Sequence, residues 1–193
     1  METNEILERV YFADLFLSRQ NIPSLSPQEL SEKLDEANEK AETLSLDEIR
    51  KEIKKNPVDI HIWLPRYTGY FCKKIKVNPN ELCLDDSHAG YDSSRRGLDN
   101  INEKRGEKLS KIMIRHKDNP EIIRRNTFVS ENFDLLMSKG WVIVRPYNST
   151  SFEVMLGNHR VMVACAKGLR EIRVLCLCQE DDSDKCVDFS LMS

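Results

Sequence analysis

The sequence has only seven glycines, and no two of them are closer than seven positions. The GxGxxG, P-loop and GxSxG signatures each need glycines two to five positions apart. These common nucleotide-binding and hydrolase signatures are therefore absent. The histidines include no HExxH and no closely spaced pair, so the sequence offers no zincin or finger-type zinc site.

Long apolar runs and paired cysteines are also missing. The longest apolar run, Val161 to Ala166, is far below the roughly 18 residues of a membrane span, and the charged first twenty residues exclude a signal peptide. The six cysteines include no CxxC, and in a chain without a secretion signal they are predicted to be reduced thiols, most of them packed in the core. We expect a cytoplasmic protein without membrane contact, metal or cofactor.

Charge is abundant and unevenly distributed. Charged residues make up 32% of the chain and hydrophobic residues 40%, which is enough apolar material for a folded core. Residues 1–50 hold 12 acids against 5 bases, whereas residues 95–125 hold 10 bases against 5 acids. An acidic N-terminal region and a basic centre are the main features of this pattern.

Residues 1–57 are predicted to form an acidic helical region. Two capping boxes, beginning at Ser26 and Ser45, mark the starts of two helices. Apolar residues follow the first of them at helical spacing, at Leu30, Leu34, Ala37 and Ala41. The helix before them carries apolar residues on nearly every side, which indicates burial on several faces or a shared surface.

Residues 58–193 are predicted to form an α+β domain. Strands are expected at 59–64 and 70–77, an exposed loop at 79–97, and basic central helices at 98–117 and 120–139, the second capped by Asn119. Four β-rich segments joined by short turns follow: Trp141 to Tyr147, Ser151 to Leu156, Arg160 to Ala166 and Glu171 to Cys178. They predict a C-terminal four-stranded antiparallel meander.

The basic centre is the leading candidate site. At helical spacing, Lys104, Lys108, Lys111 and Arg115 fall on one stripe of the predicted helix. The full predicted nucleic-acid-binding set is Arg95, Arg96, Lys104, Lys108, Lys111, Arg115, Arg124 and Arg125. Repeated cations can meet a phosphate backbone. The expected partner is a polyanion, either nucleic acid or an acidic protein surface. The competing interpretation is a solvated helix face, which is the usual role of such a charged stripe.

Two alternatives remain open. In the first, the acidic N-terminal helices act as a protein-interaction inhibitor or adaptor for a charged protein surface of basic character, with Tyr11, Phe12 and Phe16 as the contact core, or the first helix joins two copies of the chain. In the second, the loop 85–99, with Asp85, Asp86, His88 and Asp92, binds Mg²⁺ or Mn²⁺ as a metal-dependent nuclease. Without catalytic signatures, the sequence favours a non-enzymatic binding or regulatory protein.

Overall fold

The computed structural model describes residues 3–20, 22, 25–55, 71–84, 107–147 and 151–178. The chain divides into two compact units. The first consists of Met1–Cys72 with Ser138–Gly140, and the second of Lys73–Met137 with Trp141–Ser193. The predicted boundary at residue 57 and the predicted strand 59–64 lie outside the described residues.

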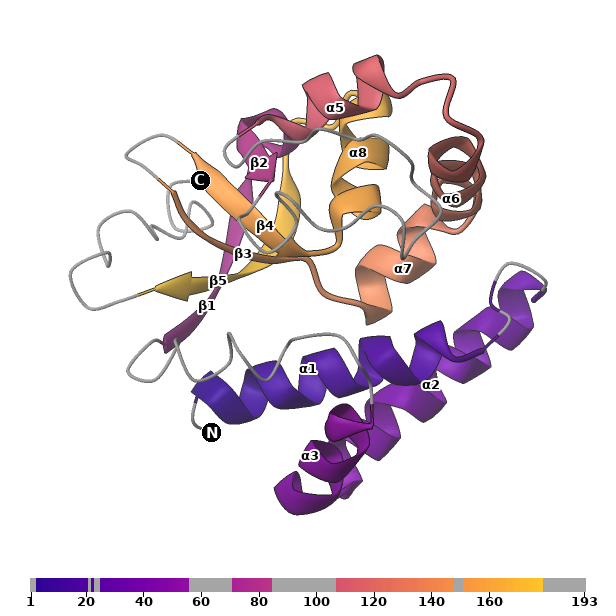
Figure 1. Cartoon of the computed structure of the whole chain (residues 1–193), viewed down its shortest axis with the longest axis vertical. Coiled ribbons are helices and arrows are strands. Elements are labelled where there is room, and N and C mark those ends of the chain that lie inside the picture. Colours follow the sequence, from indigo (N-terminus) through magenta and orange to yellow (C-terminus); the bar gives the residue numbers. More distant parts are fainter. Residues whose placement is uncertain are drawn as a thin grey trace. The chain divides into compact units, whose positions relative to one another are not determined.

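In the described residues of its N-terminal stretch, the first unit has the helices α1 (Thr3–Ser18), α2 (Pro27–Thr43) and α3 (Leu46–Lys54). Both α2 and α3 pack against α1 (Figure 1). The predicted stripe on α2 is confirmed, because its four apolar residues, Leu30, Leu34, Ala37 and Ala41, are all buried. Ile49 and Ile53 are the buried residues of α3. The three helices therefore share one apolar core.

Local side-chain bonds define where these helices begin. Ser26 and Ser45 accept hydrogen bonds from the backbone N–H groups of Glu29 and Glu48, and each glutamate carboxylate accepts a bond from the backbone N–H of its serine. Both predicted capping boxes are confirmed. Each satisfies backbone N–H groups that have no partner within the helix.

Two arginine contacts tie the helices of this unit together. Arg9 of α1 donates to the carbonyl oxygen of Leu44, at the C-terminal end of α2, at 3.0 Å. Arg50 of α3 donates to the buried carboxylate of Glu8 on α1 at 3.0 Å. A cation at the last carbonyls of α2 also interacts favourably with the helix dipole. These bonds join α2 and α3 to two adjacent residues of α1, Arg9 and Glu8.

The second unit is built on one five-stranded mixed sheet with the order β1-β5-β3-β4-β2 (Figure 1). Its strands are β1 (Phe71–Val77), β2 (Leu82–Leu84), β3 (Ile143–Pro146), β4 (Phe152–Leu156) and β5 (Ile172–Cys178). β3 pairs with β4 in antiparallel and with β5 in parallel orientation, and β2 runs parallel to β4. The α+β class is confirmed, but the predicted antiparallel meander is wrong.

Helix α8 (Asn158–Ala166) explains that error, because it occupies the segment predicted as the strand from Arg160 to Ala166. Val161, Met162, Val163 and Ala164 are four consecutive buried residues. A short apolar run buried on all sides does not show whether it is helix or strand. The helix packs against α5 (Leu109–Arg115), α6 (Pro120–Glu131) and the 3-10 turn η3 (Pro79–Glu81).

Two glycines bound α8. Gly157 precedes it with φ of +100° and Gly168 follows it with φ of +67°. Gly168 N–H bonds to the Cys165 carbonyl at 3.0 Å and Leu169 N–H to the Ala164 carbonyl at 3.1 Å. This pair of bonds is a Schellman motif, in which glycine takes the left-handed position without the steric cost of a Cβ.

The central helices differ from their predicted bounds. The helix expected over 98–117 includes α5 at 109–115, and residues 98–106 lie outside the described part of the chain. The helix expected over 120–139 is interrupted at Asn132, which separates α6 from α7 (Phe133–Lys139). The Asn119 cap is confirmed. The predicted loop 79–97 is wrong at its start, where η3 and β2 lie, and residues 85–97 are outside the described part of the chain.

The cysteines match the prediction in part. Cys72, Cys83, Cys165 and Cys176 are thiols outside any disulfide. Cys176 and Cys178 are fully buried in β5 with their sulfur atoms 3.5 Å apart. Cys178 is disulfide-bonded, so the prediction of reduced thiols is wrong at this position. Cys186 lies outside the described residues.

Candidate functional site

The predicted basic site is described only in part. Arg95, Arg96 and Lys104 lie outside the described residues. Lys108 is the N-cap of α5, with an extended backbone that forms a β-bridge to Cys83. Because the helix begins after Lys108, this residue does not continue the helical stripe of Lys111 and Arg115.

Carboxylates lie beside most of the described cations of this set. Lys108 donates to Glu81 at 2.9 Å, a bond that raises the pKa of the lysine, and Arg115 pairs with Glu107. Within the described part of the chain, Lys111 is exposed and has no ion-pair partner.

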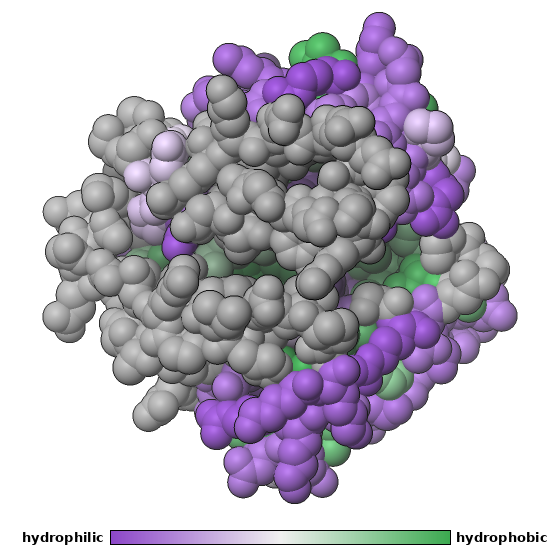
Figure 2. Space-filling view, in the orientation of Figure 1, coloured by the Kyte–Doolittle hydropathy of each residue, from purple (hydrophilic) through white to green (hydrophobic). Residues whose placement is uncertain are grey.

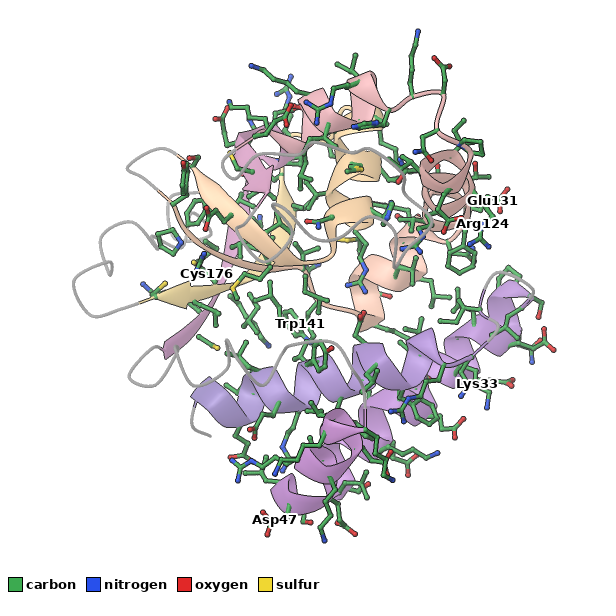
Figure 3. The ribbon with its side chains drawn as sticks, in the orientation of Figure 1. Lys33, Asp47, Arg124, Glu131, Trp141 and Cys176 are labelled. Carbon is green, nitrogen blue, oxygen red and sulfur yellow. The ribbon has the colours of Figure 1, made fainter. Side chains whose placement is uncertain are left out.

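Arg124 and Arg125 share one carboxylate on α6. Their guanidinium groups lie 3.0 Å and 2.6 Å from Oε1 of Glu121. The hydrogen bonds from these two arginines lower the pKa of Glu121 to about 2. Arg124 projects from α6 as an exposed side chain (Figure 3). Glu121 therefore neutralises part of the positive charge that Arg124 and Arg125 bring to α6.

The structure offers no support for metal or thiol catalysis in its described residues. Asp85, Asp86, His88 and Asp92 lie outside them, and no cluster of His, Cys, Asp and Glu side chains elsewhere in the described ranges could hold a metal ion. Burial raises the pKa of the free thiols Cys83 and Cys165, which disfavours the nucleophilic thiolate.

Phe12 and Phe16, two of the three predicted contact residues of the first helix, line a groove, and Tyr11 is not part of its lining. Phe12 is buried, whereas Tyr11 and Phe16 are half-buried. The Lys40 ammonium lies 4.3 Å from the centroid of the Phe16 ring, a cation–π contact between α2 and α1. Phe12 and Phe16 thus face a place where all three helices of the first unit meet.

This groove has a volume of about 770 Å³ and is formed within the first unit alone. It falls in the range of pockets that hold small molecules or short peptide segments. Its lining, which we call the α1–α3 groove, consists of Phe12, Leu15, Phe16, Arg19, Gln20, Lys40, Leu44, Glu48, Lys51, Glu52, Lys54 and Lys55. The apolar residues Phe12, Leu15, Phe16 and Leu44 form the floor of the groove, and most of the other lining residues are charged.

Helical periodicity builds the two walls of the groove. On α1 and just beyond it, Phe12, Leu15, Phe16 and Arg19 recur at positions i, i+3, i+4 and i+7, which form one face of a helix. On α3 and its C-cap, Glu48, Lys51, Glu52 and Lys55 follow the same spacing. The second wall lies away from the buried Ile49 and Ile53 because those residues face the core.

The charge of the groove is opposite to that of the N-terminal region as a whole. Five of its lining residues are cations and two are carboxylates. Glu52 pairs with Arg19 at 3.2 Å and also with Lys55, while Glu48 is held by the Ser45 cap. Among the described residues, the exposed Lys51 and Lys54 form no ion pair.

Phe12 and Phe16 are the two lining residues that the sequence predicted as contacts, and the other ten were not predicted. The i, i+3, i+4, i+7 spacing on residues 48–55 is a signal that could have revealed the second wall. On the face shown in Figure 2, α1 to α3 are mostly hydrophilic, with small hydrophobic patches between polar side chains.

Comparisons of the chain with protein-family models, with curated proteins and with solved structures each found no match. None of the described helices is both long and apolar enough to cross a membrane.

Proposed function

We propose that the chain is a non-enzymatic protein-binding module, an adaptor or inhibitor that receives a partner segment in the α1–α3 groove. The observation that carries this proposal is the juxtaposition of half-buried Phe16 and Leu44 with buried Phe12 and Leu15 in one depression. Apolar side chains that line an open depression are typical anchors for a partner residue.

The arrangement of helices supports docking over catalysis. A groove between two helical walls accepts a third amphipathic helix, whose apolar residues at i, i+3, i+4 and i+7 match the spacing of the walls. The Arg9 and Arg50 bonds hold those walls together before any partner binds. A preformed groove loses less conformational entropy on binding than one that must be assembled.

The polyanion hypothesis receives less support from the described residues. Lys108, Arg115, Arg124 and Arg125 each lie beside a carboxylate of the same unit. Contacts between these cations and phosphates would have to replace existing ion pairs, which reduces the gain from counterion release. This comparison favours the groove as the main interaction surface.

A peptide-display selection tests the proposal. A library of helical peptides with randomised apolar and charged positions is selected on the full chain and, in parallel, on Phe16→Ala. We expect peptides enriched on the unmodified chain to bind Phe16→Ala at least about ten-fold more weakly, because the variant removes an anchor contact.

Ile114→Ala is the matched control, because Ile114 is an exposed apolar residue on α5, outside the groove. It should retain full peptide binding. Circular dichroism confirms that both variants stay folded. Peptides that bind Phe16→Ala as well as the unmodified chain, or a selection without enrichment, would contradict the proposal.

A further inference from the structure

We infer that the partner of the α1–α3 groove is an acidic amphipathic helix, with apolar residues on one face and Asp or Glu residues beside them. This inference rests on the proposed docking function and adds the charge of the partner. It differs from the sequence-based expectation that the acidic N-terminal helices seek a basic surface.

The cations around the groove supply the first argument. Both carboxylates of the lining already have partners within the chain: Ser45 bonds to Glu48, and Arg19 and Lys55 bond to Glu52. Lys51 and Lys54, in contrast, are exposed and have no ion pair in the described part of the chain. The groove therefore presents positive charge that an acidic partner can neutralise.

The distribution of acids on α2 supplies the second argument. The exposed acids Glu32, Asp35, Glu39 and Glu42 recur along the face of α2 that lies opposite its buried stripe. Lys40 and Leu44, which line the groove, belong to a different side of the helix. These four carboxylates of α2 are thus separated from the groove, whereas Glu36 of the same helix pairs with the lining Lys40 at 2.7 Å.

The apolar floor of the groove favours a peptide over a nucleic acid as the partner. Phe12, Leu15, Phe16 and Leu44 form the floor, and aliphatic or aromatic anchors of a peptide would exclude water from it. About three helical turns, or roughly 11 residues, are enough to place four anchors at i, i+3, i+4 and i+7. A basic helix with the same anchors would bring its charges towards Lys51 and Lys54.

The test uses two synthetic peptides of about 14 residues with identical Leu and Phe positions. One carries Glu at the flanking positions and the other carries Lys. Fluorescence anisotropy measures the binding of each to the full chain. We expect the Glu peptide to bind at least about ten-fold more tightly at about 0.1 M NaCl, and the difference to shrink near 1 M, where the screening length falls from about 10 to about 3 Å.

Charge reversal links the preference to the groove. The double variant K51E/K54E should lose most of the preference for the Glu peptide, since it replaces two unpaired cations with carboxylates. The variant K117E/R170E changes the net charge by the same amount at two exposed cations of the second unit that belong to no proposed site, and it should leave the preference unchanged. All four positions are exposed, so neither variant removes core packing.

The outcomes distinguish the acidic-partner inference from the docking function on which it rests. Equal binding of both peptides, lost in Phe16→Ala, would overturn the acidic-partner inference and leave the docking function in place. Binding of neither peptide, together with a failed display selection, would overturn both. Single-stranded DNA that competes with the Glu peptide at equal affinity, or a dimer of the chain that Phe16→Ala dissociates, would also overturn this choice of partner.

Discussion

Arg145 and Glu153 are paired across the antiparallel strands β3 and β4, and both guanidinium contacts are made to the same carboxylate oxygen. Nε and Nη2 of Arg145 lie 2.9 and 2.8 Å from Oε2 of Glu153. The Glu153 side chain is fully buried, while that of Arg145 is 18% exposed. The pair therefore brings ionic charge into the sheet of the second unit.

Arg145→Met should destabilise the chain by about 3 kcal/mol, because it leaves a buried carboxylate without its arginine. Urea unfolding followed by circular dichroism measures the free energy of unfolding. The double variant Arg145→Met/Glu153→Leu should recover much of this loss, since it removes both charges. A double variant less stable than Arg145→Met alone would show that the ion pair is not the source of the effect.

Gly157→Ala should destabilise the chain by about 2 kcal/mol. The residue has φ of +100°, and an added Cβ would lie 3.0 Å from Cγ2 and 3.3 Å from Cα of Val142. Gly168→Ala is the control, because its φ is +67° but no atom lies within 4 Å of an added Cβ. It should cost only about 1 kcal/mol. Equal unfolding midpoints for the two variants would contradict the steric part of this argument.

Stability should decrease when the Glu121 carboxylate is protonated. Its folded-state pKa of about 2 lies below the ordinary value of 4.5, so the ion pairs with Arg124 and Arg125 contribute above pH 4.5. That contribution is lost as the pH falls from 4.5 towards 2. Because solvent screens these side chains, we expect at most about 1 kcal/mol. Acid unfolding of Glu121→Gln should lack this component, and an unchanged pH profile would argue against the low pKa.

Glu121→Gln also tests the polyanion hypothesis. Removing the shared carboxylate releases two guanidinium groups, so the variant should bind duplex DNA more tightly than the unmodified chain. The slope of log affinity against log salt should steepen by up to about 2. Fluorescence anisotropy across a salt series provides the measurement. Tight binding by the unmodified chain, with a slope unchanged in Glu121→Gln, would favour a basic site that does not depend on these arginines.

Ser45→Ala should destabilise α3 by about 1 kcal/mol, because it removes the hydroxyl that accepts from the Glu48 N–H. Ser45→Asp keeps an acceptor at the cap and should retain most of the stability. Urea unfolding of the two variants makes the comparison. If both had the unfolding midpoint of the unmodified chain, the cap would contribute nothing measurable to the folded state.

Local signals in the sequence were sufficient for the N-terminal helices. Ser26 and Ser45 interact with residues three positions later, and Leu30 and Leu34 lie one turn apart on the same helix face. Such relationships involve neighbours in the chain. They can therefore be recognised before the tertiary structure is known.

Contacts between distant residues explain what the sequence did not reveal. Lys108 leaves the predicted helix because its backbone pairs with Cys83, 25 positions earlier in the chain. Val161 to Ala164 form a helix in a position where α5, α6 and η3 surround them. The groove is formed by residues of α1, α2 and α3 that are distant in the chain. Its aromatic wall lies on a single helix, and only that wall was inferred from the sequence.

The order of strands in the sheet has a consequence for synthesis of the protein. β5 is the last of the five strands in the chain, but it lies between β1 and β3. Ribosomes add about 5–20 residues per second from the N-terminus, so β1 and β3 emerge well before the strand that separates them. Until Ile172–Cys178 has left the exit tunnel, β3 keeps an open edge and β1 has no neighbour in the sheet. The sheet therefore closes only after β5 has emerged, and until then β1 and β3 expose unpaired backbone groups to other chains.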